Sequence, residues 1–287
     1  MITKIIKIVL FVFLLNISFV SSKSVVYEKV DDLNFFKSKV LTETHPKDDV
    51  LVIFDIDDTL LEAKRFVGSN KWYLWQRGKK NVFDDKNMPL SVKKEEKFNC
   101  IAGTLGTLFD LGGTNKTQEN ADEILSELQQ YNLLILTSRS IGFRGPTERE
   151  LKKNNFNLAK SHLMEKNIGL TYVFDDGDRA SDVTYQHGIV MSSGLNKGLV
   201  LHDLLDKLNK SYKSIYFIDD SLKNITQMQQ VWEKSETNVS IFHYTKVDQR
   251  ISPKEIKESN AAKKEFDQFL MTTYPERAKR FTSAICD

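Results

Sequence analysis

The sequence predicts an α/β fold with a doubly wound, mostly parallel β-sheet. Apolar runs of strand length alternate with amphipathic stretches, and this alternation indicates parallel β-α units. The runs are nearly continuous in apolar residues, which is typical of strands whose two faces are both covered by helices. The clearest predicted strands are Val50–Asp55, Leu133–Thr137, Ile215–Asp219 and Ser240–Tyr244. The predicted helices are Gln118–Gln130, Thr147–Lys153, Lys197–Leu208, Leu222–Trp232 and Pro253–Tyr274.

Two intervals interrupt the alternation and are predicted to be insertions over one edge of the sheet. Residues 62–115 combine basic and aromatic residues with a helical stretch, and we expect a small helical, aromatic cap after the first strand. Residues 171–194 hold short runs around an Asp-Asp-Gly-Asp turn, a pattern typical of a β-hairpin. The core is then expected to comprise residues 23–61 and 116–287, with the last helix packed on it.

The N-terminus has the pattern of a secretory signal. Lys4 and Lys7 precede an almost uninterrupted apolar run at residues 8–20, and small residues follow up to Ser22. This run is shorter than the about 20 apolar residues that a membrane-spanning helix needs. Residues 1–22 are therefore predicted to be a cleaved signal peptide, which implies a secreted or periplasmic protein without a stable membrane span. A retained N-terminal anchor is the alternative.

Charge and cysteine content exclude several classes of protein. The chain carries 41 Lys and Arg against 39 Asp and Glu, so the concentrated basic surface that a nucleic-acid partner requires is not expected. Two cysteines exclude a disulfide scaffold and a four-cysteine zinc site. In an oxidising compartment Cys100 and Cys286 can form one bridge, while two unrelated buried thiols fit the sequence equally well.

Reactive side chains follow three of the predicted strands. Ligands of open α/β sheets bind outside the carboxyl ends of the strands, so these side chains are expected to meet in one crevice. The period-two alternation of a strand directs Asp55 and Asp57 to the same side as the first strand ends. The elements are Asp55-Ile56-Asp57-Asp58-Thr59, then Thr137-Ser138-Arg139, then Lys197 at the start of a helix, and finally Asp219-Asp220.

This set of residue types is suited to phosphoryl transfer. Clustered carboxylates repel one another, and Mg²⁺ relieves the repulsion by binding one or two of them together with a substrate phosphate. Phosphoryl transfer mainly requires such neutralisation and positioning, and the carboxylate of Asp55 can attack phosphorus to form an aspartyl-phosphate. Thr137 can hydrogen-bond a phosphate oxygen, and Lys197 can balance the charge on phosphate and nucleophile.

Simpler explanations fit single residues but not the whole set. A calcium loop of the EF-hand kind that begins at Asp55 requires Gly at its sixth position and Glu at its twelfth, where the chain has Leu60 and Phe66. Asp219 and Asp220 alone suit a helix N-terminus, where carboxylates interact favourably with the dipole. The order of all the elements and their shared position at strand ends favour one common site.

The order of these residues resembles the four motifs of the haloacid dehalogenase-like (HAD) superfamily of phosphohydrolases. The resemblance covers roughly residues 48–245 and implies a Rossmann-like HAD core. The Asp-x-Asp-x-Thr motif is matched by Asp55, Asp57 and Thr59, the second motif by Thr137, the third by Lys197 and the fourth by Asp219-Asp220.

The resemblance implies a role for each matched residue. Asp55 is the implied nucleophile, and Asp57 the implied general acid and then base. The implied Mg²⁺ ligands are Asp55, the main-chain carbonyl of Asp57 and the fourth-motif acid, with Asp220 favoured over Asp219 as the direct ligand. Asp219 departs from the Gly that most members carry, and Asn224 stands where many members have a second acid.

The predicted function is that of a Mg²⁺-dependent phosphomonoesterase. The signal sequence, the tryptophan-rich insertion and the Thr-Ser-Arg element are also similar to those of the periplasmic acid phosphatases of the superfamily and of an uncharacterised branch, domain of unknown function family 2608. A phosphotransferase of the same fold and a catalytically silent phosphate-binding module are the alternatives.

Substrate selection is expected to reside in the insertions, because the core contacts only the phosphate. The candidate cap can offer aromatic walls and a cationic rim to an aryl phosphate such as phosphotyrosine, or to a nucleoside phosphate. Alternatively, the tryptophans pack the insertion onto the core and the charges are solvated. The candidate substrate-binding residues are Lys64, Arg65, Trp72, Trp75 and Arg77 in the insertion, and Ser138, Arg139 and Arg144 after the second motif.

Overall fold

The computed structural model describes residues 25–78, 92–161, 163–164, 168–282 and 286. The predicted signal peptide lies outside this part of the chain. Across the described ranges, no helix combines the length and the apolar character that crossing a membrane requires.

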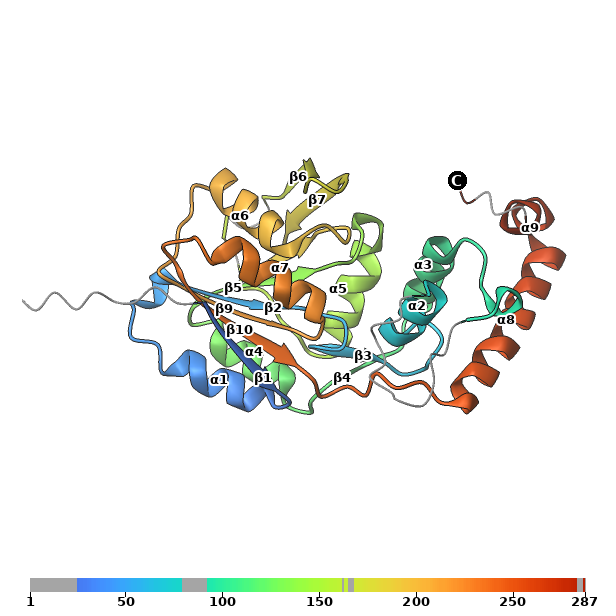
Figure 1. The fold of residues 1–287 in the computed structure, drawn as a ribbon, viewed down its shortest axis with the longest axis horizontal. Coiled ribbons are helices and arrows are strands. Elements are labelled where there is room, and N and C mark those ends of the chain that lie inside the picture. Colours follow the sequence, from blue (N-terminus) through green and yellow to red (C-terminus); the bar gives the residue numbers. More distant parts are fainter. Residues whose placement is uncertain (1–24, 79–91, 162, 165–167, 283–285, 287) are drawn as a thin grey trace, which may run out of the picture.

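An eight-stranded sheet forms the centre of the protein (Figure 1). Its strand order is β1-β10-β9-β2-β5-β8-β7-β6. The first six strands in this order, β1 to β8, pair with their neighbours in parallel. The last two, β7 and β6, extend the sheet in antiparallel pairing. The prediction of an α/β fold with a mostly parallel sheet is therefore confirmed. The strands are β1 (Val25–Val30), β2 (Val50–Phe54), β5 (Asn132–Thr137), β6 (Leu170–Asp175), β7 (Ala180–Gln186), β8 (Ile189–Met191), β9 (Ser214–Asp219) and β10 (Asn238–Tyr244).

Helices cover both faces of this sheet, which explains the continuous apolar runs. In β2, Val52 and Phe54 join the apolar cluster on one face, while Leu51 and Ile53 join the cluster on the other. Each buried side chain of this kind contributes about 1.5–3 kcal/mol. The first face is covered by α1 (Leu33–Leu41), α4 (Ala121–Leu128) and α5 (Arg144–Lys153), and the second by α6 (Lys197–Lys207) and α7 (Leu222–Trp232).

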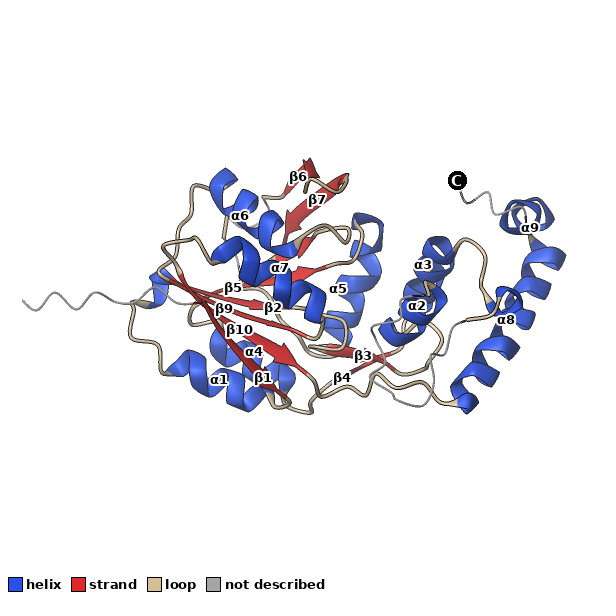
Figure 2. Cartoon of the chain, in the orientation of Figure 1, coloured by secondary structure: helices blue, strands red, loops and turns tan. Residues whose placement is uncertain are grey.

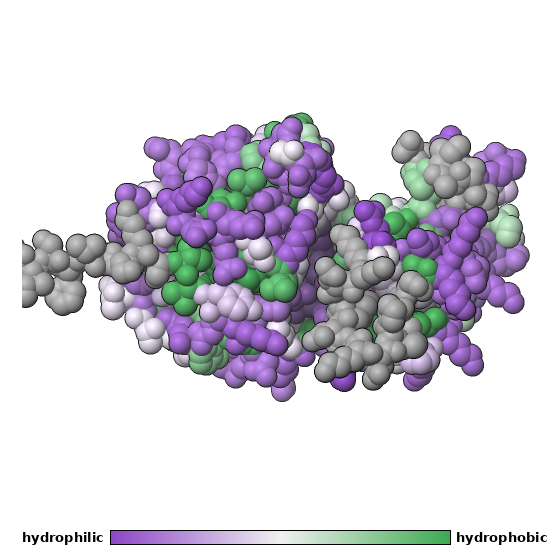
Figure 3. Space-filling view, in the orientation of Figure 1, coloured by the Kyte–Doolittle hydropathy of each residue, from purple (hydrophilic) through white to green (hydrophobic). Residues whose placement is uncertain are grey.

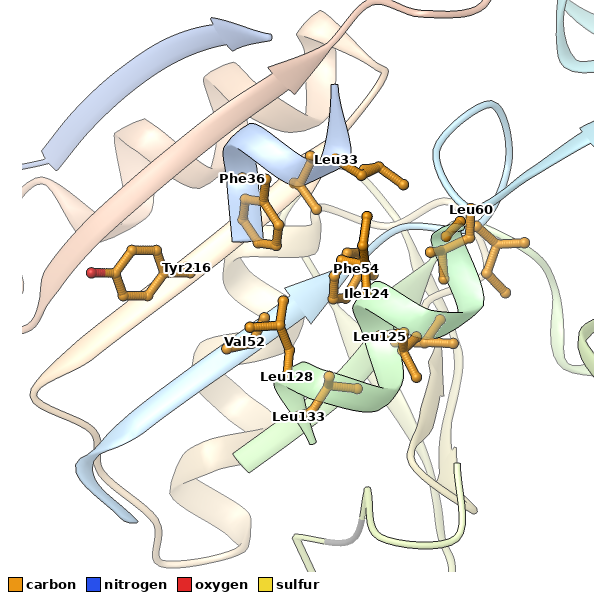
Figure 4. Close-up of a cluster of buried hydrophobic side chains, with 14 of the residues drawn as sticks. Leu33, Phe36, Val52, Phe54, Leu60, Ile124, Leu125, Leu128, Leu133 and Tyr216 are labelled. Carbon is orange, nitrogen blue, oxygen red and sulfur yellow. The ribbon is translucent and has the colours of Figure 1, made fainter. Parts of the chain in front are cut away.

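Figure 4 shows the cluster on the first face. Phe36 of α1 lies against Phe54 of β2 in an edge-to-face arrangement, with ring centroids 5.1 Å apart. Ile124 and Leu128 of α4 pack on the same side of β2. This packing anchors the strand that leads directly into Asp55.

A separate helical layer, here called the cap, lies beyond the carboxyl ends of β2 and β10 (Figure 2). A two-stranded antiparallel ribbon connects the core to it. The ribbon consists of β3 (Leu61–Ala63) and β4 (Thr114–Lys116), and the cap of α2 (Asn70–Gln76), the short 3₁₀ helix η3 (Lys94–Glu96), α3 (Ile101–Leu111), α8 (Pro253–Thr273) and α9 (Pro275–Thr282).

The expectation that the last long helix packs on the core is wrong. Ile256, Ala262 and Phe266 of α8 pack against the aromatic cluster of the cap, which contains Trp72 and Trp75. The amphipathic pattern indicates that α8 buries one face, but the insertion offers an apolar partner as well as the sheet does. The cap is thus built from two segments far apart in the sequence.

A disulfide ties the end of the chain to the cap. Cys100, directly before α3, is bonded to Cys286, and their Cα atoms are 5.1 Å apart. Leu270 of α8 and Ala278 of α9 pack beside Cys100. Because the bridge spans a sequence separation of 186 residues, loop entropy predicts a stabilisation of roughly 5 kcal/mol.

Candidate functional site

A tight turn after β2 positions the first group of acidic residues. The strand ends at Phe54, and the buried carbonyl of Ile56 then accepts the N–H groups of Thr59, Leu60 and Leu61. Asp58 closes the turn with a φ of 57°, a left-handed conformation that Asp adopts more readily than most residues. The turn leaves the side chain of Asp55 5% exposed and that of Asp57 35% exposed.

Lys197 lies between two buried carboxylates. Its Nζ is 2.6 Å from Oδ1 of Asp55 and 2.6 Å from Oδ2 of Asp219. Although burial opposes it, the charges of Asp219 and Asp55 raise the pKa of Lys197 above its ordinary value. Lys197 is therefore a permanent cation shared by two strand ends.

The start of α6 delivers Lys197 to this position. The side chain of Asn196 caps the helix by accepting the N–H groups of Gly198 and Leu199. Gly198 permits close packing on α7, since a Cβ there would lie 2.9 Å from the carbonyl oxygen of Gln227. A larger residue would displace the helix start, and Lys197 with it.

Three carboxylates converge at the carboxyl ends of β2 and β9. Asp55, Asp219 and Asp220 each offer an oxygen, and these oxygens lie within 4.8 Å of one another. Burial is the main cause that raises the pKa of Asp55 and of Asp220, and neighbouring acids add to it. When all three acids are ionised, the cluster holds more negative charge than Lys197 alone balances, and a cation would favour that ionised state. An all-oxygen set of this kind fits a hard divalent cation such as Mg²⁺.

The two fourth-motif acids have different surroundings. Asp219 is fully buried and accepts hydrogen bonds from Lys197, from the N–H of Ser221 and from Nδ2 of Asn224, which lies 3.0 Å from both carboxylate oxygens. Asp220 is less buried, and its Oδ2 accepts one hydrogen bond, 3.2 Å long, from Nδ2 of Asn70 in the cap. Asp220 therefore retains more free lone pairs than Asp219.

The second-motif residues separate into a buried and an exposed group. Thr137 ends β5 fully buried, and its Oγ1 accepts the N–H of Arg139 at 3.2 Å. Ser138 is exposed at the strand end. Arg139 is 6% exposed, and two of its nitrogens bind the carboxylate of Asp57. The contact of Arg139 with a substrate stays a prediction, and in the structure its guanidinium binds Asp57.

The prediction that Trp72 and Trp75 contact the substrate is wrong, because the structure buries both side chains. Their side chains are 0% and 1% exposed, respectively, and both lie inside the cap cluster. The Nε1 of Trp72 donates to Oγ of Ser259 in α8 at 3.0 Å. The alternative of structural packing is therefore correct, although the tryptophans pack onto α8 and not onto the core.

A cleft of about 1020 Å³ lies between the core and the cap. The space-filling view shows a hollow between these two parts of the protein (Figure 3). Asp57, Asp58 and Arg139 line its core side, and Arg65 lines its cap side. Asp55 and Lys197 are not part of the lining, so the carboxylate cluster lies deeper than Asp57.

Three polar residues of this site are difficult to recognise from the sequence, because they match no motif or match one only weakly. Asp58 is 4% exposed and accepts a hydrogen bond of 2.8 Å from Nε2 of Gln249. Asn70 donates to Asp220, as described above. Asp58 can be predicted to belong to the site because it directly follows Asp57. Asn70 and Gln249 are far from the motifs in the sequence, and only the fold brings them to the site.

The fold and the site define an α/β protein with a lysine-bridged carboxylate cluster at the carboxyl edge of a mostly parallel sheet. The chain belongs to the family described as protein of unknown function (DUF2608), whose model matches residues 29–275. The predicted resemblance to that family is thereby confirmed. No curated protein and no solved structure matches the chain.

Proposed function

We propose that the protein is a Mg²⁺-dependent phosphomonoesterase of the HAD type that forms an aspartyl-phosphate on Asp55. The observation that carries the proposal is the position of Lys197, whose Nζ lies 2.6 Å from both Asp55 and Asp219, beside the third carboxylate of Asp220. A fixed cation next to a carboxylate lowers the repulsion that an approaching phosphate would meet.

The nucleophile has one oxygen available. Lys197 holds Oδ1 of Asp55, and no other side chain in the described ranges donates a hydrogen bond to that carboxylate. Attack by Oδ2 forms the Asp55–phosphorus bond while the bond from phosphorus to the leaving oxygen breaks. Thr137, buried at the end of the neighbouring strand β5, is suited to hold a phosphate oxygen.

The carboxylate cluster suits Mg²⁺, which supplies charge neutralisation of the phosphate when bound. Asp55 and Asp220 are the residues best placed to hold it, and the resemblance to the HAD superfamily implies the carbonyl of Asp57 as a further ligand. Asp219 is already engaged by Lys197, Ser221 and Asn224, so we assign it to the support of Lys197.

Asp57 is suited to proton transfer because it lines the cleft, where the leaving group must lie. In the first step it gives the leaving oxygen a proton, which it can carry only on an oxygen that Arg139 has released. In the second step it takes a proton from the water that attacks phosphorus, and this releases phosphate and restores Asp55. Arg139 binds both oxygens of Asp57, so one of them must be released for either transfer.

The test is hydrolysis of p-nitrophenyl phosphate with Mg²⁺ and then with excess EDTA. We expect turnover that EDTA abolishes, and the loss of turnover in Asp55→Asn with an unchanged fold. Asp57→Asn should slow both steps. Asp206→Asn, at an exposed position of α6, is the matched control. Substantial turnover by Asp55→Asn would contradict the assignment of the nucleophile.

The Arg139–Asp57 pair favours one alternative, a phosphate-binding module without turnover, because a carboxylate that keeps both oxygens on the guanidinium has no free oxygen for proton transfer. Binding of inorganic phosphate without hydrolysis over a broad pH range would support that alternative. A higher rate of product formation on addition of an alcohol would indicate a phosphotransferase.

Export is also part of this proposal. The disulfide between Cys100 and Cys286 is typical of an oxidising compartment, which agrees with the predicted signal peptide at residues 1–22 and with a secreted or periplasmic location. Detection of the mature protein outside the cytoplasm, beginning at residue 23, is the corresponding test.

A further inference from the structure

We infer that the cleft between core and cap selects small phosphomonoesters with an apolar body and a second anionic group at its far end, bound by Lys64 and Arg65. The inference rests on the proposed function, since it names the substrate class of the same site. It is carried by the size, the lining and the charge of the cleft.

The volume of the cleft exceeds what a phosphate group needs. Its about 1020 Å³ is at the upper end of the range for small-molecule sites, about 300–1,000 Å³. Asp57 lies on the core side, and Lys254 of α8 lies on the cap side. A substrate that fills this space carries an organic part much larger than its phosphate.

The cap presents an apolar surface to this organic part. Leu108, Phe109 and Leu111 of α3 line the cleft, and Leu111 is 78% exposed. A ligand that covers a leucine side chain as exposed as this one removes its apolar surface from water, which favours binding. The tryptophans of the cap do not contribute, because they are buried inside the cap cluster and do not line the cleft.

Two exposed cations of the cleft lining have no ion-pair partner among the described residues. Lys64 and Arg65 have exposed side chains, and neither forms an ion pair or hydrogen bond through its side chain with another described residue. Four carboxylates of the lining have a cationic partner: Asp57 has Arg139, Glu150 has Arg149, Glu255 has Lys71, and Glu258 has Lys254. The fifth, Asp58, is buried and accepts a hydrogen bond from the neutral amide of Gln249.

The ribbon sets the distance between the two anionic groups. Leu61, the first residue of β3, is bridged to Asp57 and bonded to Asp58 beside the reaction centre. Lys64 follows the last residue of this strand. At about 3.3 Å per residue, its backbone lies about 10 Å further along the ribbon. The second anion is therefore separated from the phosphate by a body such as two aromatic rings.

The experiment compares two probes that differ in one charge. The first is a 4-biphenylphosphonate with a carboxylate at the far para position, and the second is its methyl ester. Binding of each is measured by titration calorimetry with Mg²⁺ present, for the full chain and for Lys64→Gln/Arg65→Gln. The control is Lys210→Gln/Lys213→Gln, since these two exposed lysines precede β9 at the opposite end from Asp219.

We expect the unmodified protein to bind the acid roughly tenfold more tightly than the ester, which is the scale of two exposed ion pairs. The preference should disappear in Lys64→Gln/Arg65→Gln, remain in the control variant, and weaken at high salt. Equal affinity for acid and ester, a failure to bind either, or a preference that survives Lys64→Gln/Arg65→Gln would each overturn the inference.

Hydrolysis of the two corresponding phosphates is measured separately. A charge-dependent binding preference without hydrolysis of either phosphate would refute the phosphomonoesterase and leave the anion site standing. Hydrolysis of both phosphates at equal kcat/KM, with no preference in binding, would refute the anion site and leave the phosphomonoesterase.

Discussion

Arg139 binds the carboxylate of Asp57 through two nitrogens of its guanidinium group, with Nε 2.9 Å from Oδ2 and Nη2 2.7 Å from Oδ1. Its Nη1 donates to Oγ1 of Thr147 in α5 at 3.0 Å. The ring of Phe109, in cap helix α3, has its centre 4.3 Å from Cζ of the guanidinium. Arg139 therefore connects the carboxylate that faces the cleft with both the core and the cap.

This contact predicts that Arg139→Lys impairs catalysis although it keeps the charge. When one oxygen of Asp57 is released for proton transfer, the planar guanidinium, anchored on Thr147, still orients the carboxylate through the other oxygen. A lysine ammonium is a point charge without that anchor. Loss of orientation of this kind lowers the rate by about 10²-fold. We expect kcat on p-nitrophenyl phosphate to fall by that order while thermal stability changes little. Full activity of Arg139→Lys would show that the bidentate contact has no role in positioning Asp57.

Lys197→Met should destabilise the protein strongly when no divalent cation is present. The substitution keeps an unbranched side chain, one atom shorter, but leaves the buried carboxylates of Asp55 and Asp219 without their cation. Removal of one partner from a buried ion pair costs about 3–5 kcal/mol. Urea unfolding in EDTA measures the change, with Lys210→Met at an exposed site as the control. Equal stability of the two variants would contradict the structural role of Lys197.

The carboxylate cluster predicts that Mg²⁺ stabilises the folded protein. A ligand that binds only the folded state at 100 times its Kd adds about 2.7 kcal/mol. We expect the Tm to rise with Mg²⁺ concentration, and the rise to be strongly reduced in Asp220→Asn because its carboxylate has the most free lone pairs. Asp248→Asn, an exposed acid outside the cluster, should retain the full rise. An identical Mg²⁺ response of both variants would exclude Asp220 as a ligand.

The sheet could be predicted from the sequence because its central strands are buried on both faces. β2, β5 and β9 have almost no exposed residue, so composition alone marks them. The convergence of Asp55 and Asp219 follows from the same pattern, since parallel strands place their carboxyl ends at one edge. Lys197 reaches that edge as the first residue of α6.

The cap was harder to predict because an amphipathic pattern shows that a face is buried but not what covers it. The pattern of α8 is satisfied equally by the sheet and by the cluster around Trp72, and only the fold decides between them. The same limit applies to Arg139, since no spacing in the sequence distinguishes an arginine that binds substrate from one that binds Asp57.

The surroundings of Glu43, which lies outside the candidate site, predict that the protein loses stability in acid. Although burial opposes it, hydrogen bonds from His45, Ser214 and Tyr216 lower the pKa of Glu43 to about 2. A depressed folded-state pKa contributes stability above the unfolded value of 4.5, and this contribution is lost as the pH falls from there to about 2.

The pH dependence can be isolated with Glu43→Gln. The ionised carboxylate contributes at most about 3 kcal/mol at neutral pH. Glu43→Gln should therefore be less stable than the unmodified protein at pH 7, and the difference between them should shrink below pH 4.5. Urea unfolding at several pH values measures it. A difference that stays constant down to pH 2.5 would show that the ionised form of Glu43 is not stabilised.

The disulfide predicts that the cap, and not the core, depends on oxidising conditions. Cys100→Ser/Cys286→Ser removes the bond that holds the chain end on α3, and loss of such a bond typically costs about 2–5 kcal/mol. Because the carboxylate cluster lies in the core, inorganic phosphate should still bind to the folded variant. We expect earlier proteolytic cleavage within α8 and α9, and a reductant should sensitise the unmodified protein to the same cleavage without further effect on the variant. Cleavage patterns that do not change with reduction would show that packing of Phe266 and Leu270 alone secures these helices.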